Sequence, residues 1–257
     1  MAHDEPCERI FSYTGMDCHD FSQSPYVLTA EQIKNACRGY KRTGDREVRI
    51  LCKQDTRESR PQAFKERGLF ILPKNNGVYY IVKGEGYVDI PDIVSPIEDY
   101  HRKLDFDLLS SQVGDSEMQH LDYAYANSLV RTFVGDDSLV LSIRGRKRAP
   151  LFNCRVSGFP LEIAGVQTEV DAGYEGRNCI VLIEAKNSRA TNTIIRQLYF
   201  PYCQWKQHTG KKVLPLFFEK KIVNGSTVYY IWQFDFKDEE DYNSIYLVKS
   251  ARYRIMA

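Results

Sequence analysis

The sequence predicts an α/β protein of the α+β kind, in which a central mixed sheet is flanked by helices. Short runs rich in β-branched and aromatic residues are typical of strands, and stripes of apolar residues at helical spacing precede and follow them. The strand candidates are 139–144, 152–156, the two arms of a hairpin over 166–186, 212–218 and 227–234. The helix candidates are 115–133, with Met118, Leu121, Tyr125 and Leu129 on one stripe, and 193–208.

Two domains are expected, residues 1–98 and residues 99–257. A chain of 257 residues is long enough for one large domain or two modest ones. Pro91 and Pro96 disfavour regular structure between them, which is typical of a linker. The boundary is therefore placed directly after this segment.

The first domain combines helices with a hairpin. Thr29 is suited to cap one helix, and Pro61 is suited to open another. Helices followed by a hairpin predict a winged-helix-like domain, a variant of the helix-turn-helix that recognises DNA. The expected elements are helices at 29–38 and 60–67, a short strand at 47–52, and a hairpin of strands 69–72 and 78–82 around the turn 73–77.

Composition limits the cellular setting. Hydrophobic residues make up 43% and charged residues 27% of the chain, which are globular values. No apolar run has the length of a membrane span, and the N-terminus lacks the basic and apolar regions of a signal peptide. Seven scattered cysteines without a Cys-x-x-Cys motif indicate free thiols in a reducing compartment. The expected location is the cytoplasm, with no membrane partner.

The hairpin over 166–186 carries the chemistry. Side chains alternate along a strand, so Glu184 and Lys186 project from one face, about 6.6 Å apart. A turn at 175–178 brings Asp171 near Leu182, one diagonal step from Glu184. Two carboxylates suit Mg²⁺, which takes oxygen ligands, waters and phosphate oxygens. A Glu-x-Lys on a strand is also compatible with a solvated ion pair worth about 0–1 kcal/mol.

Asp171 followed by Glu184-Ala-Lys186 resembles the motif of the PD-(D/E)xK nuclease superfamily, although Val170 stands where Pro is usual. The segment 196–202, Arg-Gln-Leu-Tyr-Phe-Pro-Tyr, is similar to the helix after the catalytic strand in many of its type II restriction endonucleases. The resemblance covers roughly residues 110–220 and implies a restriction-endonuclease-like core.

The resemblance also implies roles for single residues. Asp171 and Glu184 would bind Mg²⁺, and Lys186 would serve the attacking water. Gln197 would support the site. Glu117 matches an acid that some members place on a helix before the core. All five are therefore candidate catalytic residues.

Basic residues outside the motif are candidates for contact with DNA phosphates and bases. One group lies in the first domain and consists of Arg57, Arg60, Lys65, Arg67 and Lys74. The other group, expected in a loop between two strands, consists of Arg144, Arg146, Lys147 and Arg148. Because acidic residues are interspersed in the first group, a solvated surface of mixed charge is the alternative. The net charge of +1 does not by itself indicate a polyanionic partner.

These observations predict a Mg²⁺-dependent endodeoxyribonuclease, a type II restriction enzyme that cuts double-stranded DNA at a short specific sequence. One chain carries one site, so cutting both strands needs a homodimer or two sequential nicks. The setting would be a prokaryotic cytoplasm, with the protein on the nucleoid when bound to DNA. The alternatives are a DNA repair or structure-selective nuclease, and a DNA-binding regulator whose nuclease-like domain is inactive.

Overall fold

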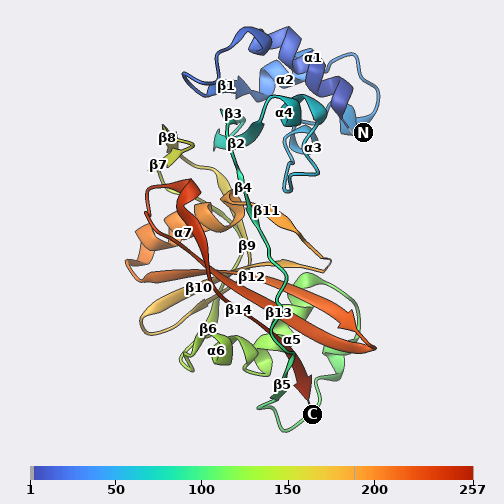
Figure 1. The fold of residues 1–257 in the computed structure, drawn as a ribbon, viewed down its shortest axis with the longest axis vertical. Helices are drawn as coiled ribbons and strands as arrows, with labels where there is room; N and C mark the ends of the chain where they lie inside the picture. Colours follow the sequence, from blue (N-terminus) through green and yellow to red (C-terminus); the bar gives the residue numbers. More distant parts are fainter. Residues whose placement is uncertain (1–2, 188, 257) are drawn as a thin grey trace.

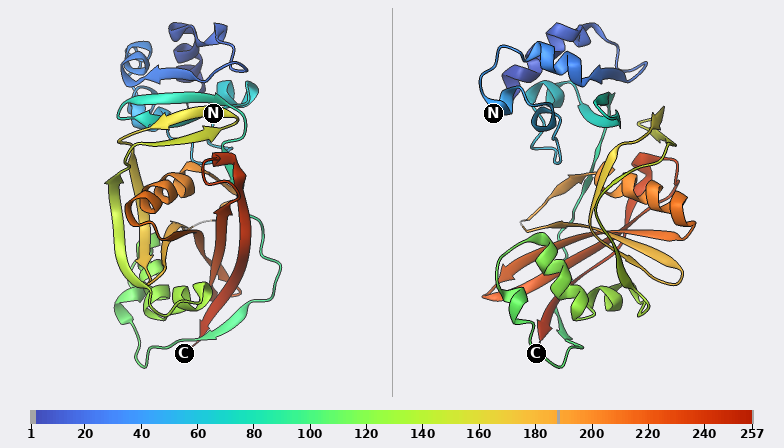
Figure 2. Two further views of the ribbon diagram at one scale, coloured as in Figure 1. Left: turned by 90° about the vertical axis from the view of Figure 1, so that its left-hand side faces the viewer. Right: turned by 180° about the vertical axis from the view of Figure 1, so that it is seen from behind.

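The computed structural model describes residues 3–187 and 189–256, which form an α+β fold with a large mixed sheet flanked by helices (Figure 1). This part of the sequence-based prediction is confirmed. In all three views, the N-terminal helices lie at one end of the molecule and the C-terminus lies at the other (Figures 1 and 2). Within the described ranges, no helix has the length and apolar character needed to cross a membrane.

The N-terminal part is built from short helices and a three-stranded sheet. The capping box at Thr29 starts α2, since its hydroxyl accepts from Gln32 N and Gln32 Oε1 accepts from Thr29 N. The helices are α1 (Asp4–Thr14), α2 (Ala30–Ala36), α3 (Val48–Leu51) and α4 (Gln62–Glu66), with short 3-10 turns at Met16–Cys18 and Thr43–Asp45. The sheet order is β1-β3-β2, with bounds Tyr26–Thr29 for β1, Leu69–Asn75 for β2 and Val78–Lys83 for β3.

The expectation of a strand at 47–52 is wrong, because the chain forms the helix α3 there. Val48 and Leu51 are the buried residues of this turn, and Arg49 and Ile50 between them are exposed. A spacing of three between buried positions is helical, whereas a strand would bury alternate residues. The helix α1 was not anticipated.

A seven-stranded mixed sheet dominates the second part, with the order β5-β14-β13-β12-β10-β9-β6. The pairs β10–β12 and β5–β14 are parallel, and the other neighbours are antiparallel. Because parallel neighbours need a long crossover, the helix α7 (Arg196–Thr209) connects β10 to β12. The strands are β5 (Glu98–His101), β6 (Val140–Arg148), β9 (Gln167–Glu175), β10 (Cys179–Lys186), β12 (Lys212–Val223), β13 (Ser226–Phe236) and β14 (Ile245–Met256).

Smaller elements complete the second part. Two short two-stranded sheets pair β4 with β11 and β7 with β8. Their bounds are Tyr87–Asp89 for β4, Asn192–Ile194 for β11, Phe152–Val156 for β7 and Phe159–Ile163 for β8. The remaining helices are α5 (Glu117–Ala126) and α6 (Leu129–Val134), with 3-10 turns at Leu109–Gln112 and Tyr242–Ser244.

Helices cover both faces of the large sheet. Val181 and Ile183 of β10 belong to the core beneath α5 and α6, whereas Ile180 and Leu182 belong to the core beneath α7. The period-two alternation expected from the sequence for Glu184 and Lys186 thus extends over the whole strand. A strand buried on both faces reads as a continuous apolar run, which explains the composition of β10.

Three expected elements differ from the structure. The single helix over 115–133 breaks between α5 and α6, because Ser128 adopts a left-handed φ of 63°. The expected helix over 193–208 begins only at Arg196, since 192–194 pair with β4 instead. The run Arg144–Arg148 is not a loop but the end of β6, paired with β9. Its basic residues therefore lie on an edge strand of the sheet.

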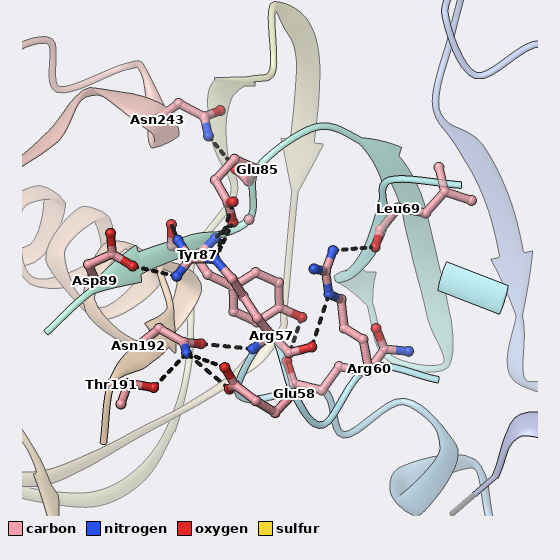
Figure 3. Close-up of polar contacts among 12 residues, drawn as sticks. Arg57, Glu58, Arg60, Leu69, Glu85, Tyr87, Asp89, Thr191, Asn192 and Asn243 are labelled. Atoms are coloured by element: carbon pink, nitrogen blue, oxygen red, sulfur yellow. Dashed lines mark hydrogen bonds and ion pairs between the residues drawn. The ribbon is translucent and has the colours of Figure 1, made fainter. Parts of the chain in front are cut away.

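The segment after the N-terminal sheet lies against the second part. β4 pairs with β11, and the backbone carbonyl of Pro91 accepts a hydrogen bond of 2.9 Å from the indole of Trp232. Figure 3 shows a second junction, in which the amide of Arg57 donates to Oδ1 of Asn192 over 2.8 Å and Asn192 donates to the carboxylate of Glu58. The boundary expected between residues 98 and 99 stays a prediction.

Candidate active site

Asp171 lies at a β-bulge in β9. Ile143 of β6 pairs with Gly173 of β9, and Gly145 pairs with Val170. An advance of two residues along β6 therefore corresponds to three residues along β9. The extra residue turns the strand, so that Val170 belongs to the core beneath α7, while Ala172 and Tyr174 belong to the core beneath α5 and α6. Bulges commonly re-aim a side chain in this way. Asp171 therefore leaves the regular ladder.

The carboxylate of Asp171 takes the place of a backbone acceptor on β10. Regular pairing between the two strands ends with Ile183 opposite Ala172, so the next step sets Asp171 opposite Glu184. Oδ2 of Asp171 accepts a hydrogen bond of 2.8 Å from the amide of Ala185. This bond fixes the first carboxylate beside the strand that carries the second.

The expected register, with Asp171 near Leu182, is wrong by two residues. The turn is tighter than expected, since the amide of Gly176 donates to the carbonyl of Cys179 over 2.8 Å. Only Arg177 and Asn178 remain between them. The shorter turn moves Asp171 from a diagonal position to one directly across from Glu184.

Glu184, Lys186 and Gln197 form a connected group. Oε1 of Glu184 accepts a hydrogen bond of 2.8 Å from Nε2 of Gln197 and also contacts Nζ of Lys186. The hydroxyl of Thr193 donates to Oε1 of Gln197 over 2.7 Å. Gln197 lies in the first turn of α7 and is thus held from both ends of its amide. A lone threonine carries no sequence signal, so Thr193 was not anticipated.

Burial and neighbouring charge shift the titration of this group. Burial raises the pKa of Glu184 to about 7, and the nearby charge of Asp171 adds to this, while Lys186 opposes it. Burial also raises the pKa of Asp171, against the hydrogen bond from Ala185 and the charge of Lys186. Burial acts to lower the pKa of Lys186, but the charge of Glu184 outweighs it and the pKa is raised.

The group opens into a cleft of about 620 Å³ that also contains Glu117, Glu169 and Arg148. Glu117 begins α5, on the other face of the sheet, and Asn187 holds this end of the helix by donating to the carbonyl of Asp115 over 2.8 Å. The negative charge of Glu117 contributes to the raised pKa of Asp171. The five candidate catalytic residues therefore line one cleft.

The paired carboxylates fit a hard divalent cation. Oδ1 of Asp171 and Oε2 of Glu184 have no hydrogen-bond partner among the described residues, which leaves one oxygen of each side chain for a cation. Over the same residues, no three His, Cys, Asp or Glu side chains gather as a metal-ligand cluster. Mg²⁺ needs no such cluster, because it commonly takes one or two carboxylates and fills its octahedron with waters and phosphate oxygens.

The basic residues expected to bind DNA in the first domain have partners within the chain. Arg57 contacts Glu85 and Asp89, and Lys65 donates to the carbonyl of Glu58. Arg60 donates to the carbonyl of Leu69, as Figure 3 shows. Arg67 contacts Glu8 and Asp17, and the ammonium of Lys74 lies 5.2 Å from the ring centre of Tyr80. None of these five residues lines the cleft, and their contact with DNA stays a prediction.

The basic residues of β6 lie nearer the site. Arg144 contacts Asp122 on α5, and Nε of Arg146 lies 3.3 Å from Glu169 at the cleft. Arg148 lines the cleft and uses one nitrogen to donate to the carbonyl of Gly165 over 3.0 Å. Lys147 is exposed. The end of this strand thus brings positive charge to the rim.

The fold and the cleft define an α+β protein with a paired-carboxylate site. Residues 82–254 match a family described as "Domain of unknown function (DUF6997)", and the chain belongs to this family. Residues 4–81 match a second family, described as "Domain of unknown function (DUF6996)". Neither the search of curated proteins nor the search of solved structures found a match.

Proposed function

We propose that this protein is a Mg²⁺-dependent type II restriction endonuclease that hydrolyses phosphodiester bonds in double-stranded DNA at a short specific sequence. The observation that carries the proposal is the meeting of Asp171, Glu184 and Lys186 in one cleft, with Gln197 hydrogen-bonded to Glu184. Two carboxylates beside an amine are what phosphodiester hydrolysis with a hard cation requires.

The order of elements supports the proposal. The helix α5 is followed by the antiparallel strands β6, β9 and β10, then by α7, and then by β12 parallel to β10. This is the order of the restriction-endonuclease-like core that the sequence resemblance implies. The helices α2 to α4 followed by the hairpin β2–β3 are compatible with a winged-helix-like recognition domain.

Each residue of the proposed active site would have its own role in the hydrolysis. Bound Mg²⁺ would lower the pKa of a coordinated water and neutralise charge on the phosphoryl oxygens. Asp171 and Glu184 would hold the ion through their free oxygens, and Gln197 would keep Glu184 in place. Lys186 would orient the attacking water and stabilise developing negative charge.

The reaction is an in-line displacement at phosphorus. The water oxygen would bond to phosphorus, and the bond from phosphorus to the 3′ oxygen would break. The water would lose a proton to solvent, and the 3′ oxygen would take one from solvent. The products would carry 5′-phosphate and 3′-hydroxyl ends.

Incubation of the purified protein with phage DNA and Mg²⁺ tests the proposal. We expect discrete fragments whose ends share a short sequence. Asp171→Ala, Glu184→Ala and Lys186→Ala should each abolish the fragments and leave DNA binding intact. Full Mg²⁺-dependent cutting by all three variants would refute the assignment.

Two other outcomes would point to the alternatives. Preferential cutting of branched or damaged DNA would indicate a structure-selective nuclease. Binding without cutting in Mg²⁺ or Mn²⁺ would indicate a regulator with an inactive site.

A further inference from the structure

The cleft has a second wall, which the N-terminal part supplies. Arg49 of α3 and Lys53 in the loop after it line the cleft, as do Asn75 and Asn76 at the tip of the β2–β3 hairpin. Figure 1 shows α3 on the side of the N-terminal part that faces the large sheet. Residues of the N-terminal part therefore line the same cleft as Asp171 and Glu184, which follow more than 90 residues later in the chain.

The cations on this wall are available to a ligand. The side chains of Arg49 and Lys53 are 90% and 72% exposed. Among the described residues, each has one loose carboxylate neighbour, with Glu47 at 3.6 Å from Arg49 and Asp55 at 3.7 Å from Lys53. Exposed pairs of this kind contribute about 0–1 kcal/mol and are easily exchanged for another anion. Arg57 and Arg67, by contrast, each contact two carboxylates within the chain.

The lining of the cleft carries charges of both signs. Its acids are Asp55 in the N-terminal part and Glu117, Glu169, Asp171 and Glu184 in the second part, and its cations are Arg49 and Lys53 in the N-terminal part and Arg148, Lys186 and Arg196 in the second part. A nucleic-acid strand brings one negative charge per phosphate and would be repelled by the acids. The flanking cations would offset this repulsion for the phosphates on either side of the bond to be cut.

We propose that Arg49 and Lys53, together with Arg148 at the end of β6 in the same cleft, form the phosphate-binding surface for the DNA strand that enters the cleft. This inference rests on the proposed nuclease function and assigns its substrate contacts. It replaces the first-domain group of Arg57, Arg60, Lys65, Arg67 and Lys74 as the main electrostatic contact. The uncharged amides of Asn75 and Asn76, at the β2–β3 turn, also line this wall.

A binding experiment with a matched control tests the surface. The double variant Arg49→Ala/Lys53→Ala removes two positive charges from the cleft. The control Lys34→Ala/Arg38→Ala removes two exposed positive charges from the same part of the chain, away from the cleft. Binding of a labelled DNA duplex of about 30 base pairs is measured in EDTA, so that no cutting occurs, over a series of salt concentrations. Thermal unfolding confirms that both variants fold.

Each phosphate contact contributes about 0.9 to the slope of log K against log salt. We expect the cleft variant to lower the steepness of this slope by about 1.8 and to weaken binding roughly 10- to 100-fold at 0.1 M salt. Arg148→Ala should lower the steepness by about 0.9. The control should match the wild-type protein.

The outcomes distinguish a failure of the phosphate-binding surface from a failure of the proposed nuclease function. Equal losses in the cleft variant and the control, or no loss in either, would overturn the phosphate-binding surface while wild-type cutting upheld the nuclease. A wild-type protein that neither binds nor cuts DNA would overturn both. The same titration with an RNA duplex tests the nature of the ligand. If the cleft variant lost binding to RNA alone, with DNA binding unchanged, the assignment of DNA as the ligand would be overturned.

Discussion

The side chain of Asp171 accepts a hydrogen bond of 2.8 Å from the backbone amide of Ala185, between the two residues of the motif on β10. The bulge in β9 ends regular pairing at this point, and the side chain supplies the acceptor that a backbone carbonyl would otherwise provide. One oxygen of Asp171 thus has a structural role, and the other accepts no hydrogen bond from the described residues.

This double role predicts that two substitutions of Asp171 differ in stability but not in activity. Asp171→Asn keeps an oxygen to accept from Ala185, whereas Asp171→Ala leaves the amide without a partner. An unsatisfied buried donor costs about 1–3 kcal/mol, so denaturant unfolding should rank the Ala variant below the Asn variant by this amount. Both should fail to cut DNA in Mg²⁺. Equal stabilities would show that the hydrogen bond is not needed to hold the bulge.

Gln197 should act as a positioning residue through its bond to Glu184. Hydrogen bonds to charged groups contribute about 1.5–3 kcal/mol, so Gln197→Ala should lower kcat roughly 10- to 150-fold. Thr193→Val keeps the shape and removes the hydroxyl that orients the amide. It should lower kcat roughly two- to tenfold, in line with about 0.5–1.5 kcal/mol for a neutral bond. KM for DNA should stay unchanged in both. A rise in KM at constant kcat would instead make Gln197 a substrate contact.

Mg²⁺ should stabilise the folded protein through the two carboxylates. An ion at 100 times its Kd contributes about 2.7 kcal/mol, which raises Tm by roughly 5–10 °C for a chain of this size. Asp171→Asn and Glu184→Gln should each lose most of this shift. Scans in NaCl of equal ionic strength control for screening. An undiminished shift in both variants would mean that the ion binds elsewhere.

Local pattern was enough to predict the strand that carries the motif. Ile180 and Leu182 pack in one core and Val181, Ile183 and Ala185 in the other, as their alternation suggests, because a strand between two helical layers has little freedom in which side chains it buries. The sequence placed Asp171 near Leu182, two residues before Glu184, the residue that it faces in the structure. The correction of this register depends on the tight turn at Arg177–Asn178, which short-range propensity does not specify.

Tertiary pairing accounts for the larger departures from expectation. Arg144–Arg148 has little intrinsic preference for strand, yet it extends β6 because β9 offers a partner and Gly145 adopts a φ of 69° at an irregular step. The cleft wall at Arg49 and Lys53 could not be found from the sequence, because only the fold brings these residues into one cleft with Asp171 and Glu184.

Stability without added metal should fall as pH rises from about 4.5 to about 7. Burial raises the pKa of Glu184 from 4.5 in the unfolded chain to about 7 in the folded one. The folded state therefore binds a proton in this window that the unfolded state has released, and its stability is full below pH 4.5 and declines as pH rises. The raised pKa of Asp171 acts in the same direction from its ordinary value of 3.8 upward.

The contribution of Glu184 amounts to about 3 kcal/mol across the window. Denaturant unfolding in EDTA at half-unit pH steps measures it. Glu184→Gln cannot titrate, so its stability should vary less between pH 4.5 and 7 than that of the wild-type protein. The comparison uses the slopes and not the absolute stabilities, because the substitution also deprives Lys186 of a counter-charge. Parallel slopes for the two proteins would show that Glu184 is already ionised at pH 5 and that its burial does not govern its titration.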